Sequence, residues 1–110
     1  MKQTMTDNFN VFVVDDDNFY SDKLQYHLTL NPDVTVTKYS NAREFLKHMD
    51  MNPDAVMLDS SLPDMSGINV LKKIREYNSS VPVVMISDKH DIQAAIALLK
   101  EGAYDYVLTR

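Results

Sequence analysis

The chain has 110 residues, no cysteine, a formal net charge of −5 and 45% hydrophobic residues. This length supports one domain with one core, and the composition is that of a globular protein. The absence of cysteine excludes disulfides and thiol chemistry, and the acidic balance argues against direct nucleic-acid binding. No apolar run could span a bilayer and residues 1–10 lack a signal-peptide core, so we expect a cytoplasmic protein that contacts no membrane.

Strands and helices are predicted to alternate along the chain. Short apolar runs between polar clusters predict five strands, at residues 9–14, 34–37, 55–58, 81–86 and 104–108. The segments between them carry apolar residues at helical spacing, which predicts four helices. Strict alternation with short connections predicts an α/β fold, in which a parallel sheet has helices on both faces.

Each predicted helix has an apolar stripe, and some have clear end signals. The stripes are Tyr20, Leu24 and Leu28; Ala42, Phe45, Leu46 and Met49; Ile68, Leu71 and Ile74; and Ile92, Ala95, Ile96 and Leu99. Asn41 and Asp91 are predicted to cap the second and fourth helices. Gly102 stands where a residue in the left-handed conformation would end the fourth helix.

Acidic residues directly follow the first and third predicted strands. Asp15 and Asp16 follow the first strand, and Asp59 follows the third. Because the carboxyl ends of parallel strands line one edge of a sheet, we expect the three carboxylates to converge there. They would repel one another unless a cation lay between them, and hard oxygen ligands suit Mg²⁺. The sequence therefore predicts a magnesium site.

Asp59 is the lone carboxylate after its strand and is the natural nucleophile. An aspartate can accept a phosphoryl group as a mixed anhydride if a metal neutralises the transferred oxygens. Asp16 would hold that metal, Asp15 would assist through water, and the Ser87 hydroxyl could bind a phosphoryl oxygen. An acidic cluster can also be simply a solvated helix N-terminus. The matching positions of Asp59 and Ser87 after other strands favour a site.

These residues resemble a known family, the receiver domains of two-component response regulators. The resemblance extends from Val11 to Thr109 and depends on four segments in order, at residues 13–17, 58–67, 82–87 and 102–108. It implies a single receiver domain over residues 1–110, with a doubly wound five-stranded sheet in the order 2-1-3-4-5. It also implies that Asp59 accepts phosphate from a histidine kinase or a phosphotransfer protein.

The resemblance implies roles for other residues as well. Mg²⁺ would be bound by Asp16, Asp59 and the backbone carbonyl of Ser61, with Asp15 assisting.

Ser87 and Tyr106 match the hydroxyl–aromatic switch pair of the family. This pair would carry the phosphorylated state to the face formed by the fourth helix and fifth strand, where an output domain or partner protein would bind. Such a domain is a signalling phosphoacceptor and not a turnover enzyme.

The chain departs from the family in two places. Family members usually carry a lysine where this chain has Thr109, which can donate a hydrogen bond but has no charge. Lys89, two residues beyond Ser87, is a candidate replacement cation, although the general exposure of lysines favours a solvated loop lysine. The chain also ends before the fifth helix of the family, so we expect apolar surface near the fifth strand, open to self-association or a partner.

Two alternative functions follow from the same residues. A pseudo-receiver would use this fold as a phosphorylation-independent interaction module, which the loss of the lysine at Thr109 favours and the acidic pocket opposes. A small Mg²⁺-dependent phosphohydrolase would need a second carboxylate two residues beyond its nucleophile. Ser61 occupies that place, so the phosphohydrolase is the weaker alternative.

Overall fold

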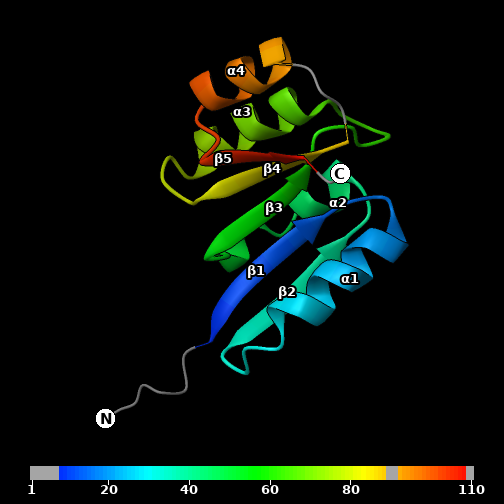
Figure 1. The fold of residues 1–110 in the computed structure, drawn as a ribbon. Coiled ribbons are helices and arrows are strands. Elements are labelled where there is room, and N and C mark those ends of the chain that lie inside the picture. The colour runs from blue at the N-terminus through cyan, green and yellow to red at the C-terminus, as the bar shows by residue number, and fades with distance from the viewer. Residues whose placement is uncertain (1–7, 89–91, 109–110) are drawn as a thin grey trace.

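Five parallel strands form one twisted sheet at the centre of the molecule (Figure 1). The computed structural model describes residues 8–88 and 92–108. The strands are β1 (Phe9–Val14), β2 (Val34–Tyr39), β3 (Ala55–Asp59), β4 (Val83–Ser87) and β5 (Asp105–Leu108). Their order is β2-β1-β3-β4-β5, and every neighbouring pair is parallel. The predicted α/β architecture and strand order are confirmed.

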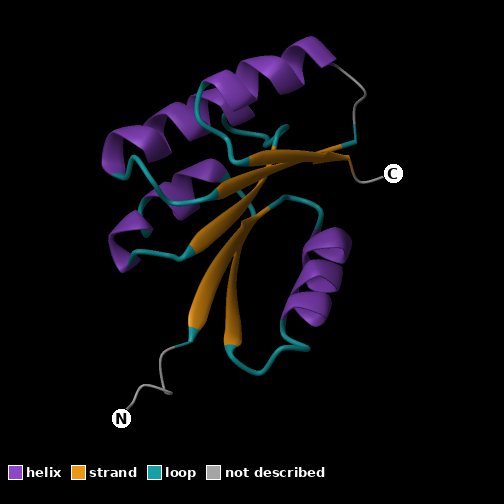
Figure 2. Ribbon diagram, turned by 60° about the vertical axis from the view of Figure 1, so that its left-hand side comes forward, coloured by secondary structure: helices purple, strands orange, loops and turns teal. Residues whose placement is uncertain are grey.

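Helices cover both faces of the sheet, as Figure 2 shows. They are α1 (Asn18–Leu28), α2 (Ala42–Leu46), α3 (Gly67–Tyr77) and α4 (Ile92–Lys100), with a short 3₁₀ helix at Met49–Met51. Helix α1 packs on one face, and α2, α3 and α4 lie on the other. Within residues 8–88 and 92–108, no helix has the length and apolar character needed to cross a membrane.

The main core lies between the sheet and α2–α4. Because side chains alternate across a strand, every second residue faces this core. The strand residues buried there are Phe12, Val14, Val56, Leu58, Val83 and Met85. Phe45 of α2 is fully buried and meets the ring of Phe12 edge-on, with centroids 6.3 Å apart. This packing fixes the strands whose carboxyl ends form the site.

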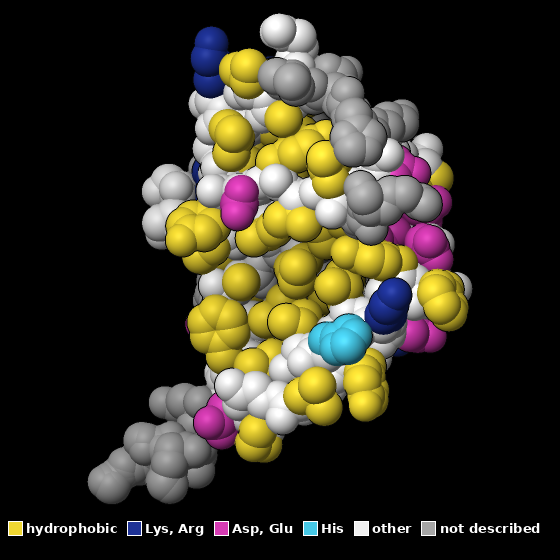
Figure 3. Space-filling view, in the orientation of Figure 1, with side chains coloured by type: hydrophobic (Ala, Val, Ile, Leu, Met, Phe, Trp, Pro, Cys, Tyr) yellow, Lys and Arg dark blue, Asp and Glu magenta, His cyan; other side chains and the backbone are white. Residues whose placement is uncertain are grey.

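The opposite face of the sheet is only partly covered. Val11 and Val13 are buried on the side of α1, but Val107 of β5 is 41% exposed. In Figure 3, apolar side chains form a broad patch across the sheet above α1. The described part of the chain therefore has the apolar surface expected near the fifth strand.

The predicted helix ends agree with the structure where it describes them. Asn41 caps α2, since its Oδ1 accepts a hydrogen bond from the backbone N–H of Glu44 at 2.9 Å. Gly102 has a φ of +106°, and the N–H of Ala103 reaches back to the carbonyl of Leu98 at 3.1 Å. The predicted cap at Asp91 lies outside the described residues.

Two details of the helix predictions are wrong. The second helix ends at Leu46, and Met49 is buried from the 3₁₀ helix that follows. Among the α4 residues whose burial is described, 93–100, the buried one is Leu98, at 5% exposure, whereas Ile96 and Leu99 are 41% and 44% exposed. The α4 stripe is therefore rotated from the predicted one, because a helix that is apolar nearly all round offers several candidate faces.

Candidate functional site

Three carboxylates converge at the carboxyl edge of the sheet, as the sequence predicts. One oxygen each from Asp15, Asp16 and Asp59 lies within 4.8 Å of the others. The register of β1 and β3 is responsible, because Val14 pairs directly with Leu58, so that Asp15 and Asp59 follow at the same level of the two strands. Asp15 is buried, Asp59 is half-buried and Asp16 is exposed.

The close approach of these carboxylates changes their proton affinity. Burial raises the pKa of Asp59 to about 7, and the neighbouring charges of Asp15 and Asp16 act in the same direction. A hydrogen bond from the backbone N–H of Ser61, 3.1 Å from Asp59 Oδ1, opposes this rise without cancelling it. Burial also raises the pKa of Asp15. Asp15 and Asp59 therefore ionise less readily than ordinary aspartates, and a bound cation would favour their ionised forms.

The donor set fits Mg²⁺. Three carboxylate oxygens from two strand ends, facing an open cavity, are hard ligands that leave room for several waters on the metal. The residues predicted to hold the ion are thus placed where they could do so. Ser61, which follows the half-buried Ser60 in the chain, lines the same cavity as the three carboxylates.

Local hydrogen bonds fix the acidic loop after β1. Asp15 Oδ1 accepts a hydrogen bond from the N–H of Asp17 at 2.9 Å. Asp17 in turn caps α1, its Oδ1 accepting from the N–H of Tyr20 at 3.2 Å. Helix α1 consequently begins at the edge of the site, and its first two turns border the carboxylates.

The carboxylates open into a cavity of about 570 Å³. It is lined by Asp15, Asp16, Asp17, Phe19, Tyr20, Lys23, Asp59, Ser61, Ile86, Ser87 and Asp88. Ser87 is 3% exposed and is the last residue of β4, one residue beyond the end of the predicted strand. A group attached to Asp59 would enter this cavity.

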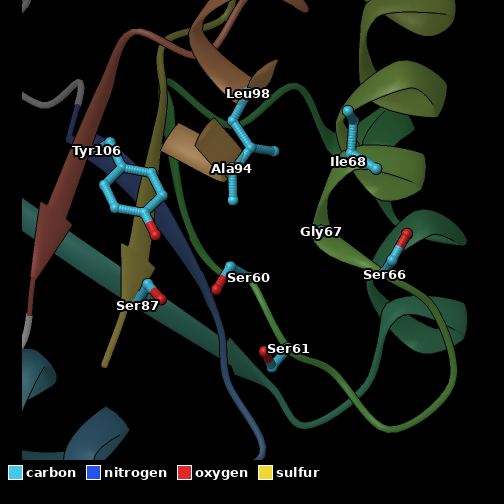
Figure 4. A pocket seen from close by; sticks show the side chains of 9 residues that line it. All are labelled: Ser60, Ser61, Ser66, Gly67, Ile68, Ser87, Ala94, Leu98 and Tyr106. Carbon is cyan, nitrogen blue, oxygen red and sulfur yellow. The ribbon is translucent and has the colours of Figure 1, made fainter. Parts of the chain in front are cut away.

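A second cavity, of about 270 Å³, lies on the other side of Ser87 (Figure 4). Its wall is made by Ser87, Tyr106 and residues of the β3–α3 loop, α3 and α4. In Figure 4 the half-buried ring of Tyr106 lies beside β4 with its hydroxyl directed toward Ser87. The two predicted switch residues line this second cavity together, and Ser87, like Ser61, also lines the carboxylate cavity.

The loop that follows Asp59 is held by two contacts. Asp64 accepts hydrogen bonds from the N–H groups of Ala42 and Arg43, both at 2.9 Å, which lowers the pKa of Asp64. Gly67 passes so close to the backbone that an added Cβ would lie 2.8 Å from Cα of Ser60. The loop is thereby fixed to the start of α2 and to the end of β3.

Sequence reasoning overlooked several residues of this site. Phe19, Tyr20 and Lys23 line the cavity from α1, and Asp64 caps α2 from a distant loop. The α1 residues could have been found, because an N-cap at Asp17 places the first helical turns at the same edge as the carboxylates. The role of Asp64 has no signal in the local sequence. Two predicted residues, Lys89 and Thr109, lie outside the described residues.

Comparison with known proteins identifies the family. The family profile of the response regulator receiver domain matches residues 11–109. The chain belongs to this family. It is thus the receiver domain of a response regulator, a signalling domain of two-component systems.

The relatives include a DNA-binding transcriptional regulator and a response regulator protein. The chain is 32% identical over 99 residues to the DNA-binding transcriptional regulator NtrC of Proteus hauseri, covering 89% of this chain and 21% of that protein. It is 33% identical over 107 residues to the response regulator protein TmoT of Ectopseudomonas mendocina, covering 96% of this chain and 48% of that protein. The receiver domain thus spans about a fifth to a half of the length of these relatives.

Solved structures agree with the fold. The receiver domain of the Francisella response regulator 1452 superposes with a TM-score of 0.84 at 28% identity, covering 93% of this chain and 84% of that one. The response regulator domain of Thermotoga maritima CheB gives 0.82 at 27% identity, covering 92% and 78%. The BeF3-activated receiver domain of DrrB gives 0.79 at 25% identity, covering 93% and 85%.

Proposed function

We propose that Asp59 is the phosphoacceptor of this receiver domain and takes its phosphoryl group from a histidine kinase or a phosphotransfer protein. The observation that carries the proposal is the convergence of Asp15, Asp16 and Asp59 in one open cavity. An Asp59 oxygen would attack the phosphorus atom of a phosphohistidine. The new O–P bond forms as the P–N bond breaks, and the electron pair stays on the histidine nitrogen, which takes up a proton.

Mg²⁺ would be held by Asp15, Asp16, Asp59 and the backbone carbonyl of Ser61. When bound, it would neutralise both the carboxylates and the phosphoryl oxygens. The high proton affinity of Asp59 supports this assignment, because a carboxyl group near pKa 7 loses its proton readily once a divalent cation replaces it. The protein's own part is to keep the Asp59 oxygen accessible while Ser61 N–H holds its partner oxygen in place.

The Ser87 hydroxyl would donate a hydrogen bond to a phosphoryl oxygen. Tyr106 would then change its position in response to the movement of Ser87. Both side chains lie between the carboxylate site and α4, which supports a relay toward the α4–β5 face. An output domain or partner protein would read that face. NtrC and TmoT are regulators longer than this chain, so an output segment that controls transcription is part of the proposal.

The alternative is a pseudo-receiver that acts without phosphorylation. Thr109 stands where the family usually has a lysine, and its uncharged side chain favours this alternative. Lys89 could supply the missing charge in the phosphorylated form. The retained carboxylate cluster favours the phosphoacceptor, because three converging carboxylates destabilise a fold that makes no use of them.

Intact-protein mass spectrometry would test the two candidates. The protein is incubated with Mg²⁺ and acetyl phosphate, with Asp59→Asn as the acceptor control and Lys89→Ala as a separate variant. A gain of one phosphoryl group by the wild type and not by Asp59→Asn is the expected result. Wild-type protein that binds Mg²⁺ but gains no mass with acetyl phosphate or with a phosphorylated histidine phosphotransfer protein would refute the phosphoacceptor in favour of the pseudo-receiver.

A further inference from the structure

The cavity around Asp59 is lined by many more acidic than basic side chains. Its lining includes five aspartates, which are Asp15, Asp16, Asp17, Asp59 and Asp88. A phosphoryl group on Asp59 would bring further negative charge, more than one divalent cation neutralises. A second cation near the phosphoryl oxygens would therefore stabilise the phosphorylated state.

Among the described residues that line this cavity, Lys23 is the single basic one. It lies on the second turn of α1, three residues after Tyr20 and four after Phe19, which line the same cavity. Residues three and four apart share one side of a helix, so the spacing directs Lys23 to the same flank. The Asp17 cap fixes where α1 begins and therefore where this flank points.

The ammonium group of Lys23 has no competing partner in the described structure. The two ion pairs found there join Lys38 to Asp22 and Lys47 to Glu44. Lys23 is exposed at the cavity mouth, and a lysine stem allows its charge to reach inward. The remaining described lysines and arginines lie on β2, on α2 and its C-cap Lys47, on α3 and on α4, outside the lining of this cavity.

We infer that Lys23 is the protein's own cation for the phosphoryl group, supplied from α1. It pairs with a phosphoryl oxygen on Asp59 from α1, whereas Ser87 lines the same cavity from β4. The inference rests on the proposed phosphorylation of Asp59, and it explains how the site could work with an uncharged residue at Thr109. It also makes α1 part of the site that holds the transferred group.

Opposite effects on two ligands make the inference testable. Lys23→Gln removes a positive charge that repels Mg²⁺ and attracts phosphate. Mg²⁺ should bind roughly threefold more tightly in calorimetric titration, by the expected size of a partly screened charge interaction. Beryllium fluoride binding in saturating Mg²⁺, and the rate of phosphorylation by acetyl phosphate, should each fall about tenfold, the loss expected for one charge-assisted hydrogen bond.

Two further variants serve as controls. Lys23→Arg keeps the charge and should retain most of the beryllium fluoride affinity. Lys72→Gln removes an equal charge from an exposed position on α3, outside the cavity, and should leave both ligands unaffected. A loss of stability in Lys23→Gln that lowered the affinity for both ligands together would show a structural role and overturn the inference.

The remaining outcomes separate this inference from the proposed function. If the wild type is phosphorylated and Lys23→Gln behaves identically, the inference is wrong and the phosphoacceptor stands. Tighter Mg²⁺ binding with unchanged phosphorylation and beryllium fluoride affinity would also overturn it. If the wild type binds Mg²⁺ but takes up neither phosphoryl group nor beryllium fluoride, the proposed function fails, and the inference fails with it.

Discussion

Replacing Asp59 with asparagine should stabilise the metal-free protein, and the gain should grow with pH. The pKa of Asp59 rises from its ordinary 3.8 to about 7, chiefly through burial. A carboxyl group with a raised pKa resists ionisation in the folded state but not in the unfolded one. Below about pH 4 both states are protonated and the substitution changes little. Between about pH 4 and 7 the unfolded state ionises first, and the wild type loses stability.

The size of the effect follows from the same two values. A difference of about 3 pH units, at about 1.4 kcal/mol for each, sets an upper limit of about 4 kcal/mol. Asp59 is only half-buried, so water screens its charge and the limit must be reduced. We expect Asp59→Asn to be more stable than the wild type by about 1–2 kcal/mol at pH 8 and by close to nothing at pH 4.

Urea unfolding followed by circular dichroism, in EDTA and at intervals from pH 4 to 8, measures this difference. Asp50→Asn is a matched control, because Asp50 is exposed on the 3₁₀ helix and lies outside the carboxylate cluster. Its stability difference from the wild type should stay nearly constant with pH. A pH-independent gain for Asp59→Asn, or a loss at pH 8, would refute the electrostatic reasoning.

Three further predictions concern the same part of the molecule. Mg²⁺ at about 100 times its dissociation constant should stabilise the wild type by about 2.7 kcal/mol at pH 8 and Asp15→Asn by clearly less, as measured by thermal unfolding. Gly67→Ala should cost about 1–3 kcal/mol in urea unfolding, because its Cβ would lie 2.8 Å from Cα of Ser60; an unchanged midpoint would contradict this. Asp64→Ala should lower the melting temperature most at pH 7 and less toward pH 3, because the pKa of Asp64 is lowered in the folded state and the stabilisation by its carboxylate is lost as pH falls through that lowered pKa. An equal loss at both pH values would argue against its carboxylate as the cap of α2.

The secondary structure was predicted best where a sequence pattern is compatible with only one kind of element. Apolar runs flanked by polar clusters predicted all five strands, and β1 agrees at both ends. Strand β2 extends to Tyr39, two residues further than predicted, because Lys38 and Tyr39 continue the pairing with β1. That extension depends on a neighbouring strand and is not visible in the residues of β2 themselves.

Helical periodicity did not predict which face of α4 is buried. Seven of the nine residues of α4 are apolar, so several stripes fit the helical repeat equally well. The structure selects Leu98, which packs in the core and beside Tyr106 in the second cavity, and leaves Ile96 and Leu99 exposed. The choice is made by β5 and α3, which contact α4 from elsewhere in the chain.

In the candidate site, too, some residues could be predicted from the sequence and others could not. Asp15, Asp16 and Asp59 could be predicted together because parallel strands share one carboxyl edge, which is a property of topology. Lys23 was overlooked although the Asp17 cap fixes where α1 begins, whereas Asp64 could not be predicted because its role depends on which helix the β3–α3 loop meets. The pairing of strands in the sheet determines where residues at strand ends lie. The packing of helices and loops determines which other side chains reach the cavity.

The geometry also explains how a change at Asp59 could reach a distant face without a long relay. Ser61 and Ser87 each line both cavities, so one layer of side chains separates the carboxylates from Tyr106 and Leu98. A phosphoryl group that drew the Ser87 hydroxyl toward itself would change the wall of the second cavity directly. That wall includes α4, whose exposed Ile96 and Leu99 adjoin it along the helix. Under the proposed function, Ser87→Ala should therefore leave Asp59 open to phosphorylation but uncouple it from the NMR shifts of Tyr106 and α4. Unchanged shifts at those residues on phosphorylation of the wild type would exclude the relay.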